Sequence, residues 1–336
     1  MAETGASALP SRAPHAAARA LWSAPAPPPE GPGSPLGRAA RFIWLTGRVL
    51  EQRLFAHLFL GGPADPVDAA LTAYANQDGS FGHGLDPAVR GPGSCAAHAA
   101  HALRVLEAVG RCDGRRVELI CRYLTSVSEP DGALAARAGE GRQGPTGVPV
   151  PRAAGTLRLA RGELGATGPV VGLLHRNDVW HAWLFRATEF CWQAVDSLAS
   201  PDPYEVASAV TFLDSAADRS RARAAADRLG RLVRAQRLVV LDPARAGASS
   251  AHYFPYDFAP RPDSLARCWF TDAETEGALD FLAAQQREDG GWPDRPAGSP
   301  GELRARVCPP AASVERRPMV TIERLRTLAA YGRVLG

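Results

Sequence analysis

The chain contains no lysine, so all 38 of its basic residues are arginine. This absence excludes catalysis through a lysine Schiff base and the lysine of a phosphate-binding P-loop. The six cysteines form no C-x-x-C pair, which argues against a structural zinc site and is typical of free thiols in a reducing compartment. No apolar run approaches the length of a membrane span, and no signal peptide opens the sequence. We therefore expect a cytoplasmic protein without a transmembrane segment.

The charge is nearly balanced, with a formal net charge of +3. This value is too small to indicate a nucleic-acid partner. The densest basic stretch, residues 219–237, alternates its arginines with alanine and leucine. That pattern is typical of the solvated face of a helix rather than of a phosphate-binding track. We expect no nucleic acid among the partners.

Composition divides the chain near residue 38. Residues 1–37 are rich in Ala, Pro and Gly and predict a disordered or loosely docked arm, whereas residues 38–336 predict one folded domain. Residues 38–62 have the apolar spacing of a single amphipathic helix that ends at Gly61-Gly62. One-faced helical patterns also occupy residues 63–75, 92–110, 113–127, 178–198, 203–216, 219–236, 272–286 and 318–334. Alternation of apolar and polar residues is nearly absent, so the sequence predicts an all-α fold.

The connections between these helices repeat an Asp-Gly turn. The pairs begin at Asp78, Asp131 and Asp289, and the second interval is about three times the first. Weaker echoes lie near residues 193–202 and 236–242. Glycine tolerates the positive φ that such a reversal requires, and a preceding glutamine can reach backbone groups at a helix end. A period of this kind, with a pair of helices in each unit, indicates a helical repeat array.

The best-formed turns are Gln-Arg-Glu-Asp-Gly-Gly-Trp at 286–292 and Gln-Asp-Gly-Ser-Phe at 77–81. They resemble the QW motif (Q-x-x-D-G-x-W) of the terpenoid cyclase and protein prenyltransferase superfamily, which includes the squalene–hopene cyclases. The resemblance covers about residues 38–335. It implies a single α/α toroid, in which inner helices surround a central cavity and outer helices pack around them.

The catalytic signatures of that superfamily do not occur in this chain. It has no D-x-D-D motif for protonating an alkene and no D-D-x-x-D motif for holding magnesium and diphosphate. It also lacks the D-x-C zinc signature of the prenyltransferases and the C-H-G signature of the lanthipeptide cyclases. We therefore expect neither a metal nor a cofactor, and function must be argued from the remaining residues.

Two aspartates are candidates for a general acid. Asp257 stands among Tyr253, Phe254, Tyr256 and Phe258, where desolvation is expected to raise the pKa of a carboxyl group. Asp86 is the second candidate, and His83 lies close to it in the sequence. For both aspartates the alternative is a structural role in a cap or turn.

Aromatic residues gather in two segments. Trp180, Trp183 and Trp192 lie in the helical pattern at 178–198, and Tyr253 and Tyr256 lie in the segment that contains Asp257. Aromatic walls stabilise carbocations through cation–π attraction, so these residues are candidates for substrate binding. The alternative is that aromatics at helical spacing form part of the core.

Cys95, His98 and His101 open the helical pattern at 92–110 at intervals of three residues. At about 100° per residue they span about 120°, so they can face one cavity. Three interpretations stay open, namely metal ligands, polar residues that line a cavity and bind substrate, and ordinary packing.

The sequence leaves several functions in competition. The first is an isoprenoid-type enzyme, cyclase-like or prenyltransferase-like, which acts on a hydrophobic small molecule in an aromatic cavity by acid-initiated carbocation chemistry. A non-catalytic toroid that binds an apolar ligand or a partner protein is the second. The third is a carbohydrate-active toroid enzyme, which needs two carboxylates flanking a groove.

Overall fold

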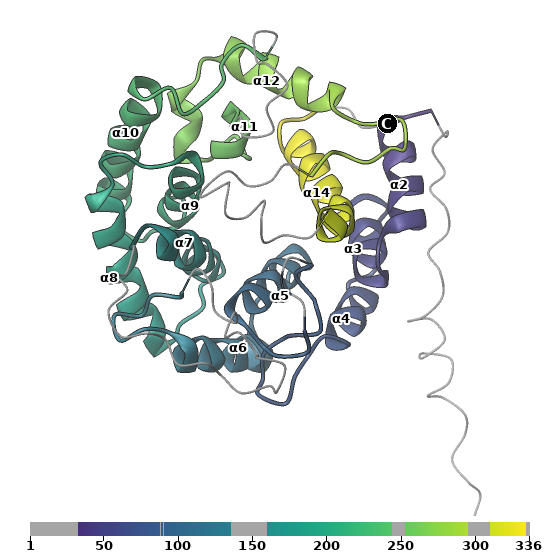
Figure 1. The fold of residues 1–336 in the computed structure, drawn as a ribbon, viewed down its shortest axis with the longest axis horizontal. Coiled ribbons are helices and arrows are strands. Elements are labelled where there is room, and N and C mark those ends of the chain that lie inside the picture. The colour runs from purple at the N-terminus through teal and green to yellow at the C-terminus, as the bar shows by residue number, and fades with distance from the viewer. Residues whose placement is uncertain are drawn as a thin grey trace, which may run out of the picture.

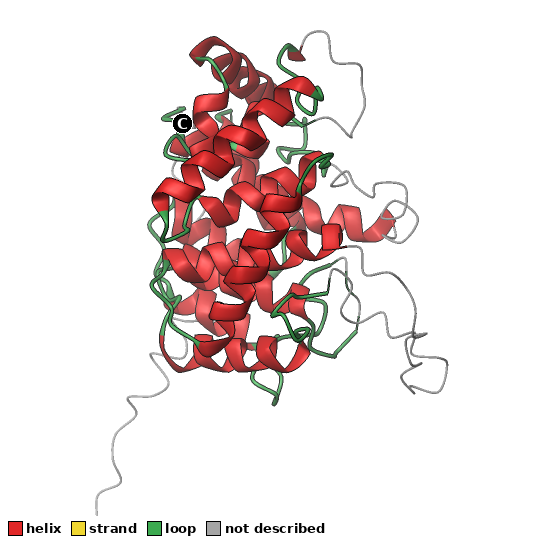
Figure 2. Cartoon of the chain, turned by 90° about the vertical axis from the view of Figure 1, so that its left-hand side faces the viewer, coloured by secondary structure: helices red, strands yellow, loops and turns green. Residues whose placement is uncertain are grey.

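The structure is a computed structural model that describes residues 33–87, 89, 91–135, 160–243, 253–294 and 310–333. Within these ranges the chain is helical and forms no strand, apart from one isolated bridge between Ala75 and Phe81 (Figure 2). The expected all-α class is therefore confirmed for the described part. The arm predicted at 1–37 lies almost wholly outside the described residues. The first described helix begins at Pro35, where Ser34 caps it.

The elements follow one another as α2 (Pro35–Thr46), α3 (Val49–Phe59), α4 (Asp65–Thr72), α5 (Ala96–Ala108), α6 (Gly114–Val127), α7 (Ala160–Arg176), α8 (Ala182–Ser197), α9 (Pro203–Leu213), α10 (Arg219–Ala235), α11 (Pro255–Phe258), the 3-10 helix η2 (Leu265–Trp269), α12 (Asp272–Ala284) and α14 (Pro310–Ala330). In Figure 1 they follow one another around the molecule. The even-numbered helices from α6 to α12 lie on the outside, and α5, α7, α9 and α14 lie nearer the middle. Contacts of α14 with both α2 and α3 bring the last helix against the first two.

The expected single helix over residues 38–62 is wrong, because the helix is interrupted at Gly47. α2 ends there in extended backbone, and α3 begins two residues later with Arg48 as its N-cap. Glycine has low helix propensity, and Glu51 accepts a hydrogen bond from the Arg48 backbone N–H, which stabilises a new helix start. The break therefore places an arginine between two helices rather than on a continuous helical face.

The three Asp-Gly turns have the same internal hydrogen bonds. In each, an aspartate Oδ1 accepts from the backbone N–H two residues on: Asp78 from Ser80 at 3.0 Å, Asp131 from Ala133 at 3.1 Å, and Asp289 from Gly291 at 3.0 Å. The residue three positions after each aspartate is buried in the core, namely Phe81, Leu134 and Trp292. One turn geometry thus recurs three times, as the sequence period predicted.

The glycine of each turn has positive φ, +83° at Gly79, +89° at Gly132 and +91° at Gly290. Each also lies directly against the next outer helix around the circuit. If these glycines carried a Cβ, the atom nearest to it would belong to Leu119 of α6, Ala187 of α8 and Arg38 of α2, respectively. The third turn precedes the last helix and rests on the first, so the repeat continues across the two ends of the described chain.

Gln286 fastens this closing turn to the beginning of α2. Its Nε2 donates to the backbone oxygen of Pro35 at 2.8 Å and to that of Gly290 at 2.9 Å. Its Oε1 accepts from Arg38 at 2.7 Å. The glutamine expected to reach backbone groups at a helix end therefore does so across the junction between the first and last parts of the described chain.

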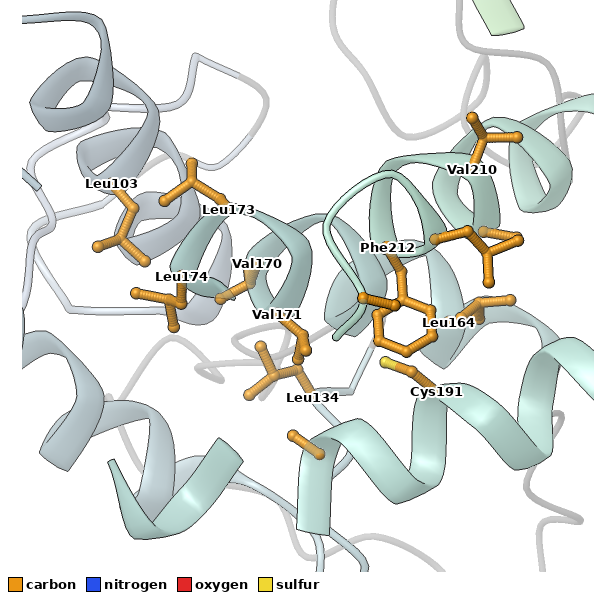
Figure 3. Packing of buried hydrophobic residues seen from close by; sticks show 14 of the residues in the cluster. Leu103, Leu134, Leu164, Val170, Val171, Leu173, Leu174, Cys191, Val210 and Phe212 are labelled. Atoms are coloured by element: carbon orange, nitrogen blue, oxygen red, sulfur yellow. The ribbon is translucent and has the colours of Figure 1, made fainter. Parts of the chain in front are cut away.

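Helix α7 has no counterpart among the helices expected from the sequence, because it is rich in glycine. Gly165, Gly168 and Gly172 form a stripe that lies against α9. A Cβ at Gly172 would come within 2.3 Å of the backbone oxygen of Thr211, so only glycine permits this approach. Figure 3 shows the apolar residues of α7, among them Val170 and Leu174, packed between neighbouring helices.

The closing turn yields a first prediction. Gly290→Ala places a Cβ 2.1 Å from the Arg38 backbone oxygen and also strains a positive φ, so we expect a loss of about 3 kcal/mol in unfolding free energy. Gly110→Ala is the matched control, because Gly110 has φ +67° but nothing within 4 Å of its Cβ position. It should cost only about 1–2 kcal/mol. Equal losses in urea unfolding would contradict the packing argument.

Candidate functional site

Arg48, placed between α2 and α3 by the break at Gly47, organises a polar cluster. Its guanidinium donates to both Glu51 oxygens, at 3.0 and 2.6 Å, and Glu51 is 2% exposed. The same guanidinium donates to the backbone oxygens of Gly84 and Leu85, at 2.9 and 3.0 Å. Burial lowers the pKa of Arg48, but hydrogen bonding to Glu51 and its charge outweigh that effect, so the pKa is raised. Arg48 thereby joins α3 to the loop that precedes α5.

That loop places the backbone of Asp86 against α5. The Asp86 backbone N–H donates to Nδ1 of His98 at 2.9 Å. Because Nδ1 accepts, the proton of the neutral imidazole is on Nε2. His98 is fully buried, and its Nε2 has no hydrogen-bond partner among the residues that the structure describes. The ring therefore presents a donor that the described part of the chain does not use.

His101 lies three residues further along the same helix. It is 6% exposed, and its Nδ1 is likewise buried without a partner in the described ranges. Arg104, three residues on again, is exposed. We name Arg48, Asp86, His98 and His101 the histidine cluster.

Burial sets the charge state of the two imidazoles. Desolvation lowers the pKa of His98, although the charge of Asp86 acts in the opposite direction. It also lowers the pKa of His101, with a further lowering from Arg104. Both rings are thus neutral at pH 7, and each can donate or accept one uncharged hydrogen bond.

His83 lies at the edge of this cluster and not within it. It is exposed, has φ +55°, and contacts Asn76 Oδ1 through Nε2 at 2.9 Å. Asn76 in turn donates to Ser94 at 2.8 Å, which holds the two ends of the loop together. His83 therefore belongs to the framework that positions Asp86.

Asp257 is in different surroundings from those expected. Its Oδ2 accepts from the Phe254 backbone N–H at 2.9 Å, and its Oδ1 from Arg324 of α14 at 3.0 Å. The Arg324 guanidinium also lies over the Tyr256 ring, 5.4 Å from its centroid. The sequence argument rested on a desolvated carboxyl group among aromatic rings, whereas the structure adds a cation bonded to it. A cap and an ion pair account for both oxygens.

The aromatic candidates do not gather around the histidine cluster. Trp183 is buried, and its Nε1 donates to the Gly132 backbone oxygen at 3.0 Å, which fastens an Asp-Gly turn to α8. Trp192 packs edge-on against Phe212, with 5.0 Å between the ring centroids. Trp180 is 80% exposed. These contacts correspond to the packing interpretation for Trp183 and Trp192.

Tyr253 and Tyr256 pack close to Asp257. Tyr256 is buried and stacks on Phe254 with 5.5 Å between ring centroids. Tyr253 is half-buried and lies 5.7 Å from the ring of Phe258. Both tyrosines therefore contribute to the packing around α11.

The metal interpretation of Cys95, His98 and His101 gains no support. In the described ranges no group of three or more His, Cys, Asp or Glu residues could hold a metal ion. Cys95 is buried at the N-cap of α5, and burial raises the pKa of its thiol, which disfavours the thiolate that metals bind.

Sequence reasoning did not find Arg48, Glu51 or Arg324. The first two had a usable signal, since Arg48 and Glu51 lie three residues apart directly after a glycine, as in a helix start. Arg324 had none, because it meets Asp257 only through the packing of α14 on α11.

Comparisons with known proteins assign no family to the chain. No protein-family model and no curated protein matches it. Among solved structures, a protein from Actinoplanes is similar, with 18% identity, a TM-score of 0.47, and coverage of 88% of this chain and 89% of the other. This likeness supports no argument about fold or function. Within the described residues no helix is both long and apolar enough to cross a membrane.

A second prediction concerns Asp257. Asp257→Asn leaves Arg324 without its carboxylate partner in a mostly buried position, so we expect a loss of about 3 kcal/mol in unfolding free energy. The matched control is Asp280→Asn, because Asp280 pairs with Arg333 on the surface with its side chain 69% exposed. Its loss should stay below about 1 kcal/mol. An Asp257 variant as stable as wild type by chemical denaturation would contradict a structural role for this pair.

The buried histidines predict acid sensitivity. Their folded-state pKa values lie below the unfolded value, so below about pH 6.5 the unfolded chain binds more protons and stability falls. Each histidine contributes a slope of up to about 1.4 kcal/mol per pH unit as the pH falls from about 6.5 towards its folded pKa.

Urea unfolding between about pH 7 and pH 5 measures this slope. His101→Gln should flatten it, while the same change at exposed His83 should not. If His101→Gln leaves the slope unaltered, His101 is not buried in its neutral form.

Proposed function

We propose that the chain is an α/α toroid of the terpenoid cyclase type and that it binds an isoprenoid-like hydrophobic small molecule on the side of its inner helices. The observation that carries this proposal is the repeated Asp-Gly turn. In its third copy, the turn before α14 places Gly290 against the backbone of Arg38 in α2, so the repeat continues from the end of the described chain to its beginning. A repeat that runs on across both ends of the described chain favours a closed ring over an open solenoid.

The histidine cluster is the best-supported binding position in that ring. It lies where α3 contacts both α5 and α14, and Sδ of Met319, near the middle of α14, is 3.9 Å from the Arg48 guanidinium. Ligand sites in proteins combine apolar surroundings with a few convergent polar groups. Here the polar groups are two buried neutral imidazoles on one face of α5, beside Ala99, Ala102 and Leu103.

A second candidate function is acid-initiated chemistry on the same ligand, with Asp86 as the acid. Asp86 is favoured over Asp257 because its backbone N–H bonds to His98, which places it in the histidine cluster. A carbohydrate-active function has less support, since Glu51, a second carboxylate that the structure describes beside the cluster, is buried against Arg48.

Equilibrium dialysis of the full chain tests the binding proposal. We expect geranylgeraniol to bind with a micromolar Kd and maltohexaose to show no binding, because the cluster offers apolar surface and few polar side chains to the ligand. Binding of the oligosaccharide in place of the isoprenoid would overturn the proposal. Absence of binding by either compound would overturn it as well.

The acid-initiated reaction is tested with the same ligand in deuterium oxide. Protonation of an alkene gives a carbocation, which becomes neutral by losing a proton from another carbon or by adding water. The carbon that was protonated then carries one solvent-derived deuterium, which mass spectrometry detects. Asp86→Asn should abolish this incorporation, and Asp257→Asn, once shown to be folded, should retain it. Wild-type protein that binds geranylgeraniol but incorporates no deuterium would show that the toroid binds without this chemistry.

A further inference from the structure

Nε2 of His98 and Nδ1 of His101 are buried without a hydrogen-bond partner in the described chain, and they indicate which chemical groups a ligand must carry. Nδ1 of His98 is taken by the Asp86 backbone N–H, so the position left over in the described chain is Nε2–H, a donor. A buried donor without an acceptor carries a desolvation penalty. The ligand group that relieves this penalty is an oxygen that accepts a hydrogen bond.

The charges of the cluster disfavour an anionic ligand. Arg48 directs its donors to Glu51, Gly84 and Leu85, so its charge is already matched within the protein. Burial keeps both histidines neutral, and Asp86 acts on them as a nearby negative charge. Among the described residues of the cluster, a diphosphate would give up its hydration without gaining an unmatched cation in return.

Arg104 is the exposed cation that follows the histidines on this stripe of α5. It lies three residues beyond His101, towards solvent, whereas His98 is fully buried. A diphosphate held by Arg104 would therefore be bound outside the histidine pair. This geometry separates two modes of binding, an anion at Arg104 or a neutral oxygen at His98.

We propose that the histidine cluster selects a neutral, oxygen-bearing isoprenoid, an alcohol, ether or ketone, through a hydrogen bond from His98 Nε2–H, with His101 Nδ1 as the second polar contact. This proposal rests on the proposed function and specifies its ligand. It predicts that affinity depends on an acceptor oxygen and does not depend on diphosphate.

The test compares four ligands of one chain length on the full-length protein by isothermal titration calorimetry. They are farnesol, farnesyl methyl ether, the hydrocarbon farnesene and farnesyl diphosphate. We expect farnesol and its ether to bind about tenfold more tightly than farnesene, which corresponds to about 1.4 kcal/mol for one buried hydrogen bond. Farnesyl diphosphate should bind no more tightly than farnesene.

The decisive variant is His98→Asn. Asparagine keeps an acceptor near the position of Nδ1 for the Asp86 N–H and removes the donor at Nε2. It should lower the affinity for farnesol and the ether to that for farnesene, with farnesene itself unaffected. His175→Asn is the matched control, because His175 is a partly buried histidine of α7 with its own unpartnered Nδ1 in the described chain, and its Nε2 contacts Thr188 of α8. It should leave all four affinities unaltered.

Three results would overturn the proposal. Tighter binding of the diphosphate, lost in Arg104→Gln, would place the site at the exposed arginine and leave the isoprenoid function standing. If folded His98→Asn lost the same factor of affinity for farnesol as for farnesene, His98 would have a structural role only. Binding of none of the four ligands would overturn the ligand class and the proposed function together.

Discussion

The close seating of each Asp-Gly turn on an outer helix is the contact on which the arrangement of the helices depends. The aspartate closes the turn on itself, and the glycine, at positive φ and without a side chain, lets the backbone press against the neighbouring helix. At Gly290 the neighbouring atom is the backbone oxygen of Arg38, which cannot move aside as a side chain could. The same kind of contact therefore recurs at three turns, and at Gly290 it joins the turn between α12 and α14 to α2.

The histidine cluster depends on this arrangement through Arg48. The guanidinium spans from α3 to the loop before α5, and Glu51 balances its charge within the protein. Burial, together with the positive charge of Arg48, lowers the pKa of both adjoining histidines against the opposing charge of Asp86. The two buried imidazoles are therefore neutral at pH 7, and each can donate or accept an uncharged hydrogen bond.

The two aspartates singled out as acids show how packing decides the role of one residue type. Asp257 and Asp86 both follow aromatic or glycine-rich segments, and the sequence ranks Asp257 first. In the folded chain Asp257 caps the short helix α11 and binds Arg324 from α14, so its carboxylate stabilises a helix junction. Asp86 instead directs its backbone at His98. No local pattern predicts Arg324 or His98 as a partner, because both come from other helices.

The sequence by itself determined the helical class, the three turns and their glycines, and the histidine stripe of α5, because each depends on contacts within a few residues. The break at Gly47 has a local signal that was recognised only in the structure, and the helix at 160–176 was decided by tertiary packing. In the first case Arg48 and Glu51 stabilise a new helix start that a continuous apolar pattern concealed. In the second, the glycines that lower helix propensity are compensated by the close approach of α9 that they permit. Local sequence preference is enough where it agrees with the final structure, as in the turns. Packing between distant segments decides where it opposes local preference, as in the glycine-rich helix α7, and where an ion pair joins distant residues.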